Sequence, residues 1–235
     1  MGPGRRSLDR GPGLFFCRGE ADADALTSNR HQHVFDRGVR KGTALDTPVI
    51  SDVVVRPSTE IDVPAMVAIY AHHVRNGLGT FDPEPLHGED IKRRRKNMMK
   101  RRLPHLVAER SGMIVGYAYA VPFRKRPAYR HAVKHSIYVH PDHLRSGVGR
   151  LLLPALIEAC TAEGFRQMIG YVDAENLPSQ QLHEAFGFHQ AGLLQGVGYK
   201  FGRWTDTLLM QRALGEGGAT PPVEPPADEN YSRAT

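Results

Sequence analysis

The sequence changes from a strand-like to a helix-like pattern across one segment, SIYVHPDHLRSGVGR, which covers residues 136–150. Apolar side chains alternate at its start, and a long apolar helical pattern follows its end. Between these patterns, Gly147 and Gly149 allow a tight turn and a close approach of the backbone to a ligand. Unpaired N–H groups at the helix start, together with Arg145 and Arg150, would attract a diphosphate. The segment therefore predicts an anion site between a strand and a helix.

Two better-known phosphate-binding patterns do not fit this segment. The third glycine of G-x-G-x-x-G is missing, and the segment does not follow a first strand, so a dinucleotide fold is disfavoured. No Lys-Ser or Lys-Thr pair follows the glycines, as it would in a P-loop. Two glycines at a helix start often serve only the turn, so the rest of the chain has to decide the function.

Alternation, turn residues and helical spacing predict the elements on both sides of this segment. Strands are expected at residues 53–56, 106–109, 114–121, 132–139, 167–172, 192–199 and 205–211. Helices are expected at residues 63–74, 90–101, 150–162 and 178–186, with Pro154 tolerated within the first turn or so of the third helix. This order predicts an α+β fold, with helices on both faces of one sheet.

Composition divides the chain into one domain and two flanking segments. Residues 1–50 have no sustained apolar period and residues 215–235 are rich in proline, so both are expected to be disordered around a domain at residues 51–214. Cys17 and Cys160 are the only cysteines, which excludes a disulfide framework and a cysteine zinc site and favours a reducing compartment. Without a secretory signal or a membrane-length apolar run, we expect a soluble, cytoplasmic protein with no membrane partner.

The formal net charge of +6 favours an anionic partner such as a phosphate-rich cofactor. Much of the basic excess lies in one run, KRRRKNMMKRR, at residues 92–102. No aromatic residues are interleaved to stack on bases, and no recognition motif accompanies the run, so a solvated helix face is the favoured interpretation. Nucleic acid is not expected as a partner, although the run remains a weak hint of one.

A series of short motifs runs through the predicted domain. They are RP at 56–57, TF at 80–81, VAE at 107–109, GYA at 116–118, PFR at 122–124, RPAY at 126–129, DAEN at 173–176, LHEAFGF at 182–188 and KFGRW at 200–204. With the segment at 136–150, this series resembles the GNAT superfamily, in particular its phosphinothricin and methionine sulfone or sulfoximine acetyltransferase branch. The resemblance implies a mixed, mostly antiparallel sheet that splays at the cofactor-binding strand, acetyl-CoA as co-substrate, no metal and a homodimer.

The resemblance also implies a cofactor site made largely by the backbone. The residues that would pair with the pantetheine arm are Ile137, Tyr138 and Val139, and those that would hold the pyrophosphate are Arg145, Ser146, Gly147, Val148, Gly149 and Arg150. Asn176 and Ser179, at the start of the last helix, resemble positions that contact the cofactor arm. Either of these two residues could instead be only a helix cap.

Two positions bear on catalysis. His183 stands where many GNAT enzymes carry a tyrosine that protonates the departing thiolate, and an imidazole can do the same near neutral pH; packing beside Glu184 is the alternative. Lys134 stands where this branch usually has a glutamate that removes a proton from the substrate ammonium. An ammonium group cannot accept that proton unless its pKa falls far below about 10.4, so the usual base is missing.

The resemblance assigns the acceptor site to a loop and an aromatic residue. Arg124, Arg126 and Tyr129 match the substrate-binding loop of the branch, where guanidinium groups could grip a carboxylate; solvated arginines are the alternative. Phe81 would wall the pocket, or is ordinary core. Leu144 departs from the Gln or Arg that commonly opens the pyrophosphate loop.

The sequence thus predicts an N-acetyltransferase that moves an acetyl group from acetyl-CoA directly to the amine of a small amino-acid-like substrate. Such substrates include phosphinothricin, methionine sulfone and methionine sulfoximine. The departure at Lys134 leaves two alternatives open. One is a catalytically weakened acyl-CoA-binding regulator, and the other is an acetyltransferase that acts on protein or on another amine.

Overall fold

The computed structural model describes residues 52–222, and a single seven-stranded sheet in the order β1-β2-β3-β4-β5-β7-β6 lies at its centre. The strands are β1 (Val53–Pro57), β2 (His105–Arg110), β3 (Met113–Pro122), β4 (Ala132–Val139), β5 (Gln167–Asp173), β6 (His189–Lys200) and β7 (Arg203–Ala213). Neighbouring strands are antiparallel, except that β4 and β5 are parallel. The prediction of a disordered segment at residues 1–50 lies outside the described residues.

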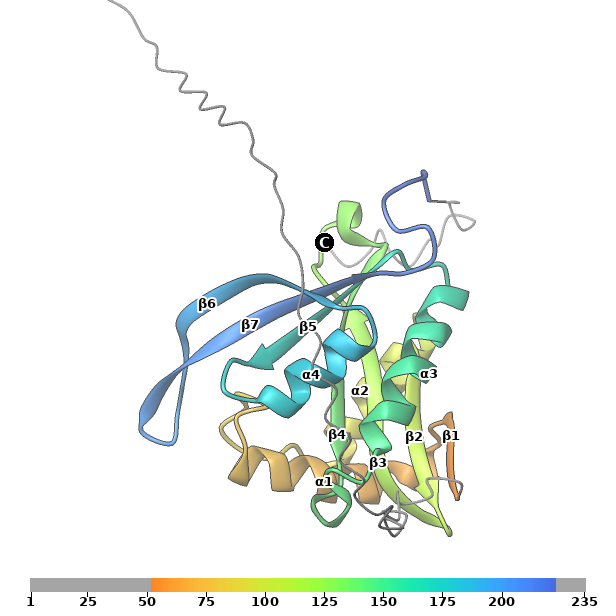
Figure 1. Cartoon of the computed structure of the whole chain (residues 1–235). Helices are drawn as coiled ribbons and strands as arrows, with labels where there is room; N and C mark the ends of the chain where they lie inside the picture. Colours follow the sequence, from red (N-terminus) through yellow and green to blue (C-terminus); the bar gives the residue numbers. More distant parts are fainter. Residues whose placement is uncertain (1–51, 223–235) are drawn as a thin grey trace, which may run out of the picture. The chain divides into compact units, whose positions relative to one another are not determined.

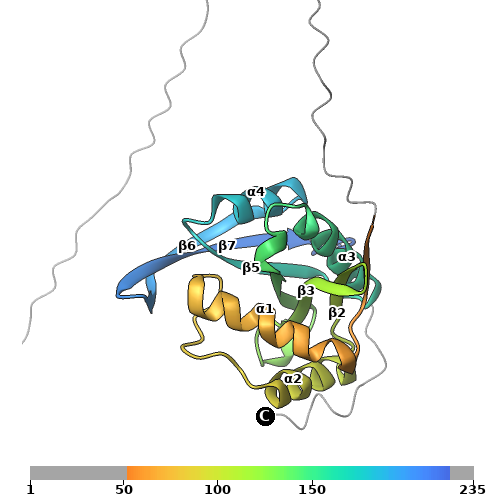
Figure 2. The ribbon, with the colours of Figure 1, turned by 90° about the horizontal axis from the view of Figure 1, so that it is seen from below.

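Four helices cover the two faces of the sheet. The helices are α1 (Val63–Asn76), α2 (Gly88–Lys100), α3 (Val148–Ala162) and α4 (Leu177–Ala185). Helices α1 and α2 lie against one face and α3 and α4 against the other, as Figures 1 and 2 show from two directions. The predicted α+β fold, with helices on both faces of a mostly antiparallel sheet, is confirmed.

The core beneath α3 is aliphatic. Leu152, Leu153 and Leu156 are fully buried at helical spacing and pack against Met168 of β5 and Met210 of β7. Burial of side chains of this size stabilises the fold by roughly 1.5–3 kcal/mol each. This layer therefore fixes α3, and with it the loop that precedes α3, against the sheet.

The core beneath α1 is aromatic where it approaches β3 and β4. The rings of Tyr117 and Tyr138 stack with centroids 5.2 Å apart, and the ring of Tyr70 from α1 meets the edge of Tyr138 at 5.4 Å. All three side chains are buried. Offset and edge-on aromatic pairs of this kind add to the stabilisation given by apolar burial alone.

An ion pair fixes the start of α1 against the sheet. The guanidinium of Arg56 donates two 2.8 Å hydrogen bonds to the two carboxylate oxygens of Asp62, and its Nε donates a third to Glu109 of β2. Asp62 also accepts from the backbone N–H of Thr59, which satisfies a donor that the following helical turn leaves free. The neighbouring guanidinium lowers the pKa of Asp62 to about 2.

Observed and expected bounds differ at α3 and at the last two strands in ways that affect the structure. Helix α3 begins at Val148 and not at 150, so Pro154 lies in its second turn, beyond the position expected for it. A proline there removes one helical hydrogen bond. Strands β6 and β7 are longer than expected, and their outer halves form a hairpin that extends past the rest of the sheet (Figure 1).

The described chain continues past Leu214, the expected end of the domain. Arg166 donates hydrogen bonds to the side chain of Thr220 and to the carbonyl of Pro221, which holds residues up to 222 against the start of β5. Residues 223–235 of the predicted tail lie outside the described part. Within residues 52–222, no helix is both long enough and apolar enough to cross a bilayer.

Candidate active site

The sheet opens along one edge of β4. Strands β4 and β5 pair only from Ala132 and Gln167 to His135 and Gly170, and β5 then continues along β7. The second half of β4 therefore pairs with β3 as its single neighbouring strand among the described residues. The N–H of His140 donates to Val115 of the β3 side. The backbone N–H groups of successive residues in a strand point to opposite sides. The N–H groups of every second residue before His140 therefore face β3, and those of the residues between them face the opening.

A cavity of about 690 Å³ fills this opening. Its walls are the second half of β4, the loop before α3 with the first turn of α3, the start of α4, and the end of α1 with the loop that follows. This volume lies within the range of cofactor sites, about 300–1,000 Å³. The predicted cofactor residues that line it are Ile137, Tyr138, Val139, Arg145, Gly147, Val148, Gly149, Arg150, Asn176 and Ser179.

The end of the cavity at α3 is suited to an anion. Gly147 precedes α3 with φ of +91°, a left-handed conformation that favours glycine. The first N–H groups of α3 have no partner within the helix, and the helix dipole makes this end positive. Arg145 and Arg150 add two cations to the same wall. A pyrophosphate with an attached extended arm fits this combination of a positive end and an open strand edge.

Gly149 has a packing role beside any role in binding. A Cβ atom at this position would lie 3.0 Å from Cδ2 of Leu182 in α4. The absence of a side chain therefore lets α3 and α4 approach each other at the mouth of the cavity. Ser146, the remaining predicted loop residue, donates its hydroxyl to the carbonyl of His143 at 2.6 Å and does not line the cavity.

The start of α4 is held by the two residues expected there. The side-chain oxygen of Asn176 accepts from the N–H of Ser179 at 3.1 Å, so Asn176 caps the helix. Both residues also line the cavity, so the residues that form the helix cap also form part of the cavity wall. The two interpretations offered by the sequence are compatible in this geometry.

His183 belongs to a buried pair of histidines. Its Nδ1 lies 2.6 Å from the carbonyl oxygen of Ser179, and its Nε2 lies 3.3 Å from Nε2 of His135. The two rings stack with centroids 5.0 Å apart, and Phe188 meets both rings edge-on. Both histidines line the cavity but are almost fully buried. A Cβ on Gly170 would lie within 3.2 Å of both Nε2 atoms, so this position has no room for a side chain.

The hydrogen bonds define the protons of this pair. A carbonyl oxygen only accepts, so Nδ1 of His183 carries a proton and donates it to Ser179. Burial lowers the pKa of His183 and lowers that of His135 to about 3, with repulsion from His183 as a smaller cause. In the neutral pair, Nε2 of His183 therefore accepts from Nε2 of His135. The Nδ1 of His135 is buried without a hydrogen-bond partner.

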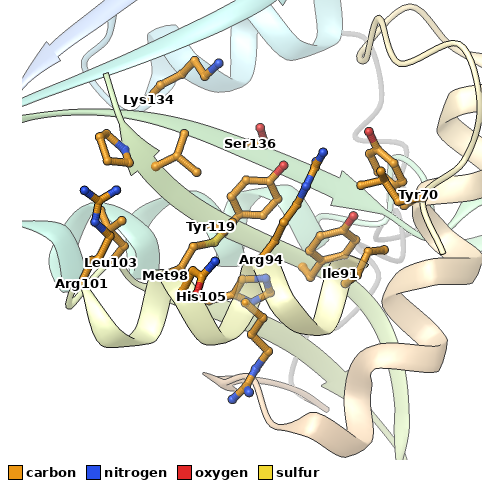
Figure 3. A pocket seen from close by; sticks show the side chains of 16 residues that line it. Tyr70, Ile91, Arg94, Met98, Arg101, Leu103, His105, Tyr119, Lys134 and Ser136 are labelled. Carbon is orange, nitrogen blue, oxygen red and sulfur yellow. The ribbon is translucent and has the colours of Figure 1, made fainter. Parts of the chain in front are cut away.

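A second cavity, of about 390 Å³, lies under α2, on the face of the sheet that α1 and α2 cover (Figure 3). We call it the α2 cavity. Its hydroxyl-bearing lining residues are Tyr70, Tyr117, Tyr119 and Ser136. Its charged lining residues are all basic: Arg94, Arg95, Arg101 and Lys134. Among the described residues, Ser136 of β4 is the single residue that lines both cavities. The two cavities thus meet at the point where β4 leaves β5.

The chain matches the acetyltransferase (GNAT) family over residues 67–188. It is 45% identical over 197 residues to a phosphinothricin N-acetyltransferase of Alcaligenes faecalis, covering 83% of this chain and 98% of that protein. A methionine sulfoximine and methionine sulfone acetyltransferase of Salmonella typhimurium is 34% identical, covering 70% of this chain and 96% of that protein. The chain belongs to the GNAT acetyltransferase family. It is therefore an acetyl-CoA-dependent N-acetyltransferase.

The same relationship appears among solved structures. A GNAT phosphinothricin acetyltransferase from Sinorhizobium meliloti, determined in complex with acetyl-CoA, matches with a TM-score of 0.72 and 40% identity. The match covers 74% of this chain and 94% of that chain. Within residues 52–222 no group of three or more metal-ligating side chains occurs.

Lys134 stands at the position where the family resemblance leads us to expect a glutamate. It lies on the α2 side of β4, and its Nζ is 5.0 Å from the centre of the Tyr171 ring. No carboxylate lines the α2 cavity among the described residues. Burial lowers the pKa of His105, another lining residue, to about 4, so this imidazole is neutral at pH 7.

The predicted acceptor residues lie outside both cavities. Arg124 stacks 5.1 Å from the centre of the Phe123 ring, and Tyr129 meets the same ring edge-on at 5.7 Å. Arg126 precedes the short 3-10 helix at Pro127–Tyr129, and this loop is mostly exposed. Phe81 packs directly on Gly198 of β6. In one copy of this GNAT chain, these four residues therefore line neither cavity.

We call the cavity along the open edge of β4 the cofactor cavity. Two contacts beside it were not predicted from the sequence. Nε2 of His73, on α1, lies 2.8 Å from the carbonyl of Val139 and donates to it across the cavity wall. Lys200, at the end of β6, donates to the carbonyls of Gly77 and Thr80 at 2.8 and 2.7 Å, which ties the loop after α1 to the hairpin. No local sequence pattern predicts either contact, because each one joins segments that are far apart in the sequence.

Proposed function

We propose that this enzyme N-acetylates a small amino-acid-like amine of the phosphinothricin, methionine sulfone or methionine sulfoximine type, by direct transfer from acetyl-CoA. The relatives named for these substrates support the substrate class. The observation that carries the proposal is the meeting of the two cavities at Ser136. Acetyl-CoA would lie along the open edge of β4, and the acceptor amine would enter from the α2 cavity on the other face.

The backbone of β4 would orient the acetyl group. The N–H of Val139 is one residue before that of His140, which bonds to the β3 side, so it points into the opening. It is suited to stabilise the oxyanion when the amine nitrogen attacks the carbonyl carbon. Holding both substrates in one geometry supplies much of the rate of such a reaction. The bond to sulfur then breaks, and the leaving thiolate takes a proton.

Proton transfer would involve solvent. The α2 cavity has no carboxylate to take the ammonium proton, so the acceptor would react as the free amine after losing its proton to water. We propose that the thiolate takes its proton from His183 or from water. Water is favoured, because the proton on His183 is bonded to Ser179 and its other ring nitrogen faces His135.

We also propose a cytoplasmic homodimer. Cys160 is a free, buried thiol, in keeping with a reducing compartment. The hairpin of β6 and β7 exposes large apolar side chains at the edge of the sheet: Leu193, Leu194, Val197, Tyr199, Phe201 and Trp204. Such a patch is typical of an interaction surface, and a second copy of the chain would cover it.

The test is release of coenzyme A from acetyl-CoA over a panel of amines. Phosphinothricin, methionine sulfone and methionine sulfoximine should give sustained turnover, whereas polyamines and a lysine peptide should give little. Turnover restricted to the peptide would instead favour a protein acetyltransferase and contradict the proposed substrate class.

A binding-only regulator is the second candidate, and Lys134 in the place of a carboxylate is the observation that favours it. It predicts that acetyl-CoA binds with ordinary affinity while no amine in the panel is acetylated. Sustained turnover on any amine would exclude it.

A further inference from the structure

The basic side chains of helix α2 differ in whether they have a partner among the described residues. Lys92 pairs with Glu60, and Arg93 pairs with Asp90 one turn earlier on the same helix. The guanidinium of Arg95 bonds to both the hydroxyl and the carbonyl oxygen of Ser58. These contacts assign three neighbouring cations of the basic run to structural roles.

Arg94 is different. It lines the α2 cavity, and within residues 52–222 it has no ion pair and no hydrogen bond. In Figure 3 its side chain extends from α2 across the cavity toward the side on which Ser136 lies. Tyr119 and Lys134 line the same space, and carboxylates among the described residues do not. Arg94 thus presents a five-donor fork to a cavity that offers it hydroxyl groups and further positive charge.

An anionic group on a ligand would pair with the charge of Arg94 and accept its hydrogen bonds. A planar guanidinium binds a carboxylate through two parallel hydrogen bonds, and these charge-assisted bonds are among the strong ones in proteins. The amine of such a ligand must reach Ser136, where the cofactor cavity begins. A molecule that carries a carboxylate beside its amine meets both requirements.

We propose that Arg94 is a specificity-determining residue that binds the carboxylate of the amino-acid acceptor from helix α2. The inference rests on the proposed function, because it takes the α2 cavity as the acceptor site. It differs from the expectation based on family resemblance, which gave this role to Arg124 and Arg126. Arg94 acts on acceptor choice and not on acetyl-CoA, since it lines only the cavity on its own side of the sheet.

The test uses the full chain and two acceptors, L-methionine sulfone and its primary amide, which lacks the carboxylate. Arg94→Gln should raise the KM for the acid about 10- to 100-fold and leave the KM values for the amide and for acetyl-CoA unchanged. Arg94→Lys should recover part of the loss, because it restores the charge without the fork. Lys96→Gln changes another exposed cation of the same helix, one that lines neither cavity, and should leave all three values unchanged.

Binding separates failure of this inference from failure of the proposed function. Calorimetric titration of methionine sulfone into protein saturated with coenzyme A reports the contact without turnover. Binding by the wild type that is weakened in Arg94→Gln, with no turnover in either, would refute the proposed function and support the Arg94 site. Equal affinity in both proteins, or an equal loss for acid and amide, would overturn the role of Arg94.

Discussion

At the scale of single residues, the proposed acceptor chemistry depends on position 134. Lys134 projects from β4 toward the α2 cavity, two residues before the strand splits from β5 into the cofactor site. A cation there disfavours a bound ammonium by like-charge repulsion, so it favours entry of the acceptor as a neutral amine. Under the proposed function, Lys134 therefore selects the deprotonated substrate and does not accept its proton.

Lys134→Glu should restore a proton acceptor at this position. We expect kcat/KM for methionine sulfone at pH 7 to rise at least ~10-fold, since general base catalysis contributes typically 10²–10⁴-fold. The dependence on pH should also flatten, whereas the wild-type rate should keep rising toward the pKa of the acceptor amine. The measurement is a profile of kcat/KM from pH 6 to 9.

Lys134→Gln is the matched control, because it removes the charge without adding a base. A glutamine variant as active as the glutamate variant would show that loss of positive charge, and not base catalysis, is the cause. An unchanged profile in Lys134→Glu would contradict the idea that position 134 meets the amine.

At the scale of elements, local patterns were sufficient for most of the sheet. Alternation and turn residues predicted β4 with the observed bounds, and helical spacing predicted α3 to within two residues at its start. The α2 cavity could not be predicted in this way. Alternation places Tyr117 and Tyr119 on one face of β3, but which helix covers that face depends on contacts between distant segments. For the same reason, local patterns could not predict that Arg94 lines the α2 cavity or that His135 and His183 form a pair.

The hairpin of β6 and β7 is the element whose exposed surface most needs a partner. β6 is an edge strand, and the rings of Tyr199 and Trp204 meet at 5.1 Å while both remain more than 60% exposed. We expect light scattering to give twice the chain mass of 26.1 kDa, and Trp204→Asp to shift it toward the monomer. Ile61→Asp, at a still more exposed apolar site outside the hairpin, should leave the dimer intact. A monomeric wild type would refute the proposed dimer.

At the scale of the whole described domain, buried neutral histidines connect folding to pH. Burial lowers the pKa of His73 and His183, lowers that of His105 to about 4 and lowers that of His135 to about 3. In the unfolded chain these groups titrate near 6.5. Below that pH the unfolded chain binds protons that the folded chain does not, so protonation favours unfolding. Stability is therefore fully present above about pH 6.5 and is lost as the pH falls.

Urea unfolding between pH 7 and 5 should measure this loss, which is about 1.4 kcal/mol per pH unit for each fully coupled histidine. His105→Phe, which keeps a ring between Tyr117 and Tyr119, should reduce the slope by about that amount. His189→Gln, at an exposed position, should leave it unchanged. Asp62 does not affect the slope between pH 7 and 5. Its pKa is about 2 in the folded protein, so its contribution to stability is lost only below about pH 4. Parallel slopes for wild type and His105→Phe would mean that folding does not lower the pKa of His105, which would contradict a neutral imidazole in the α2 cavity.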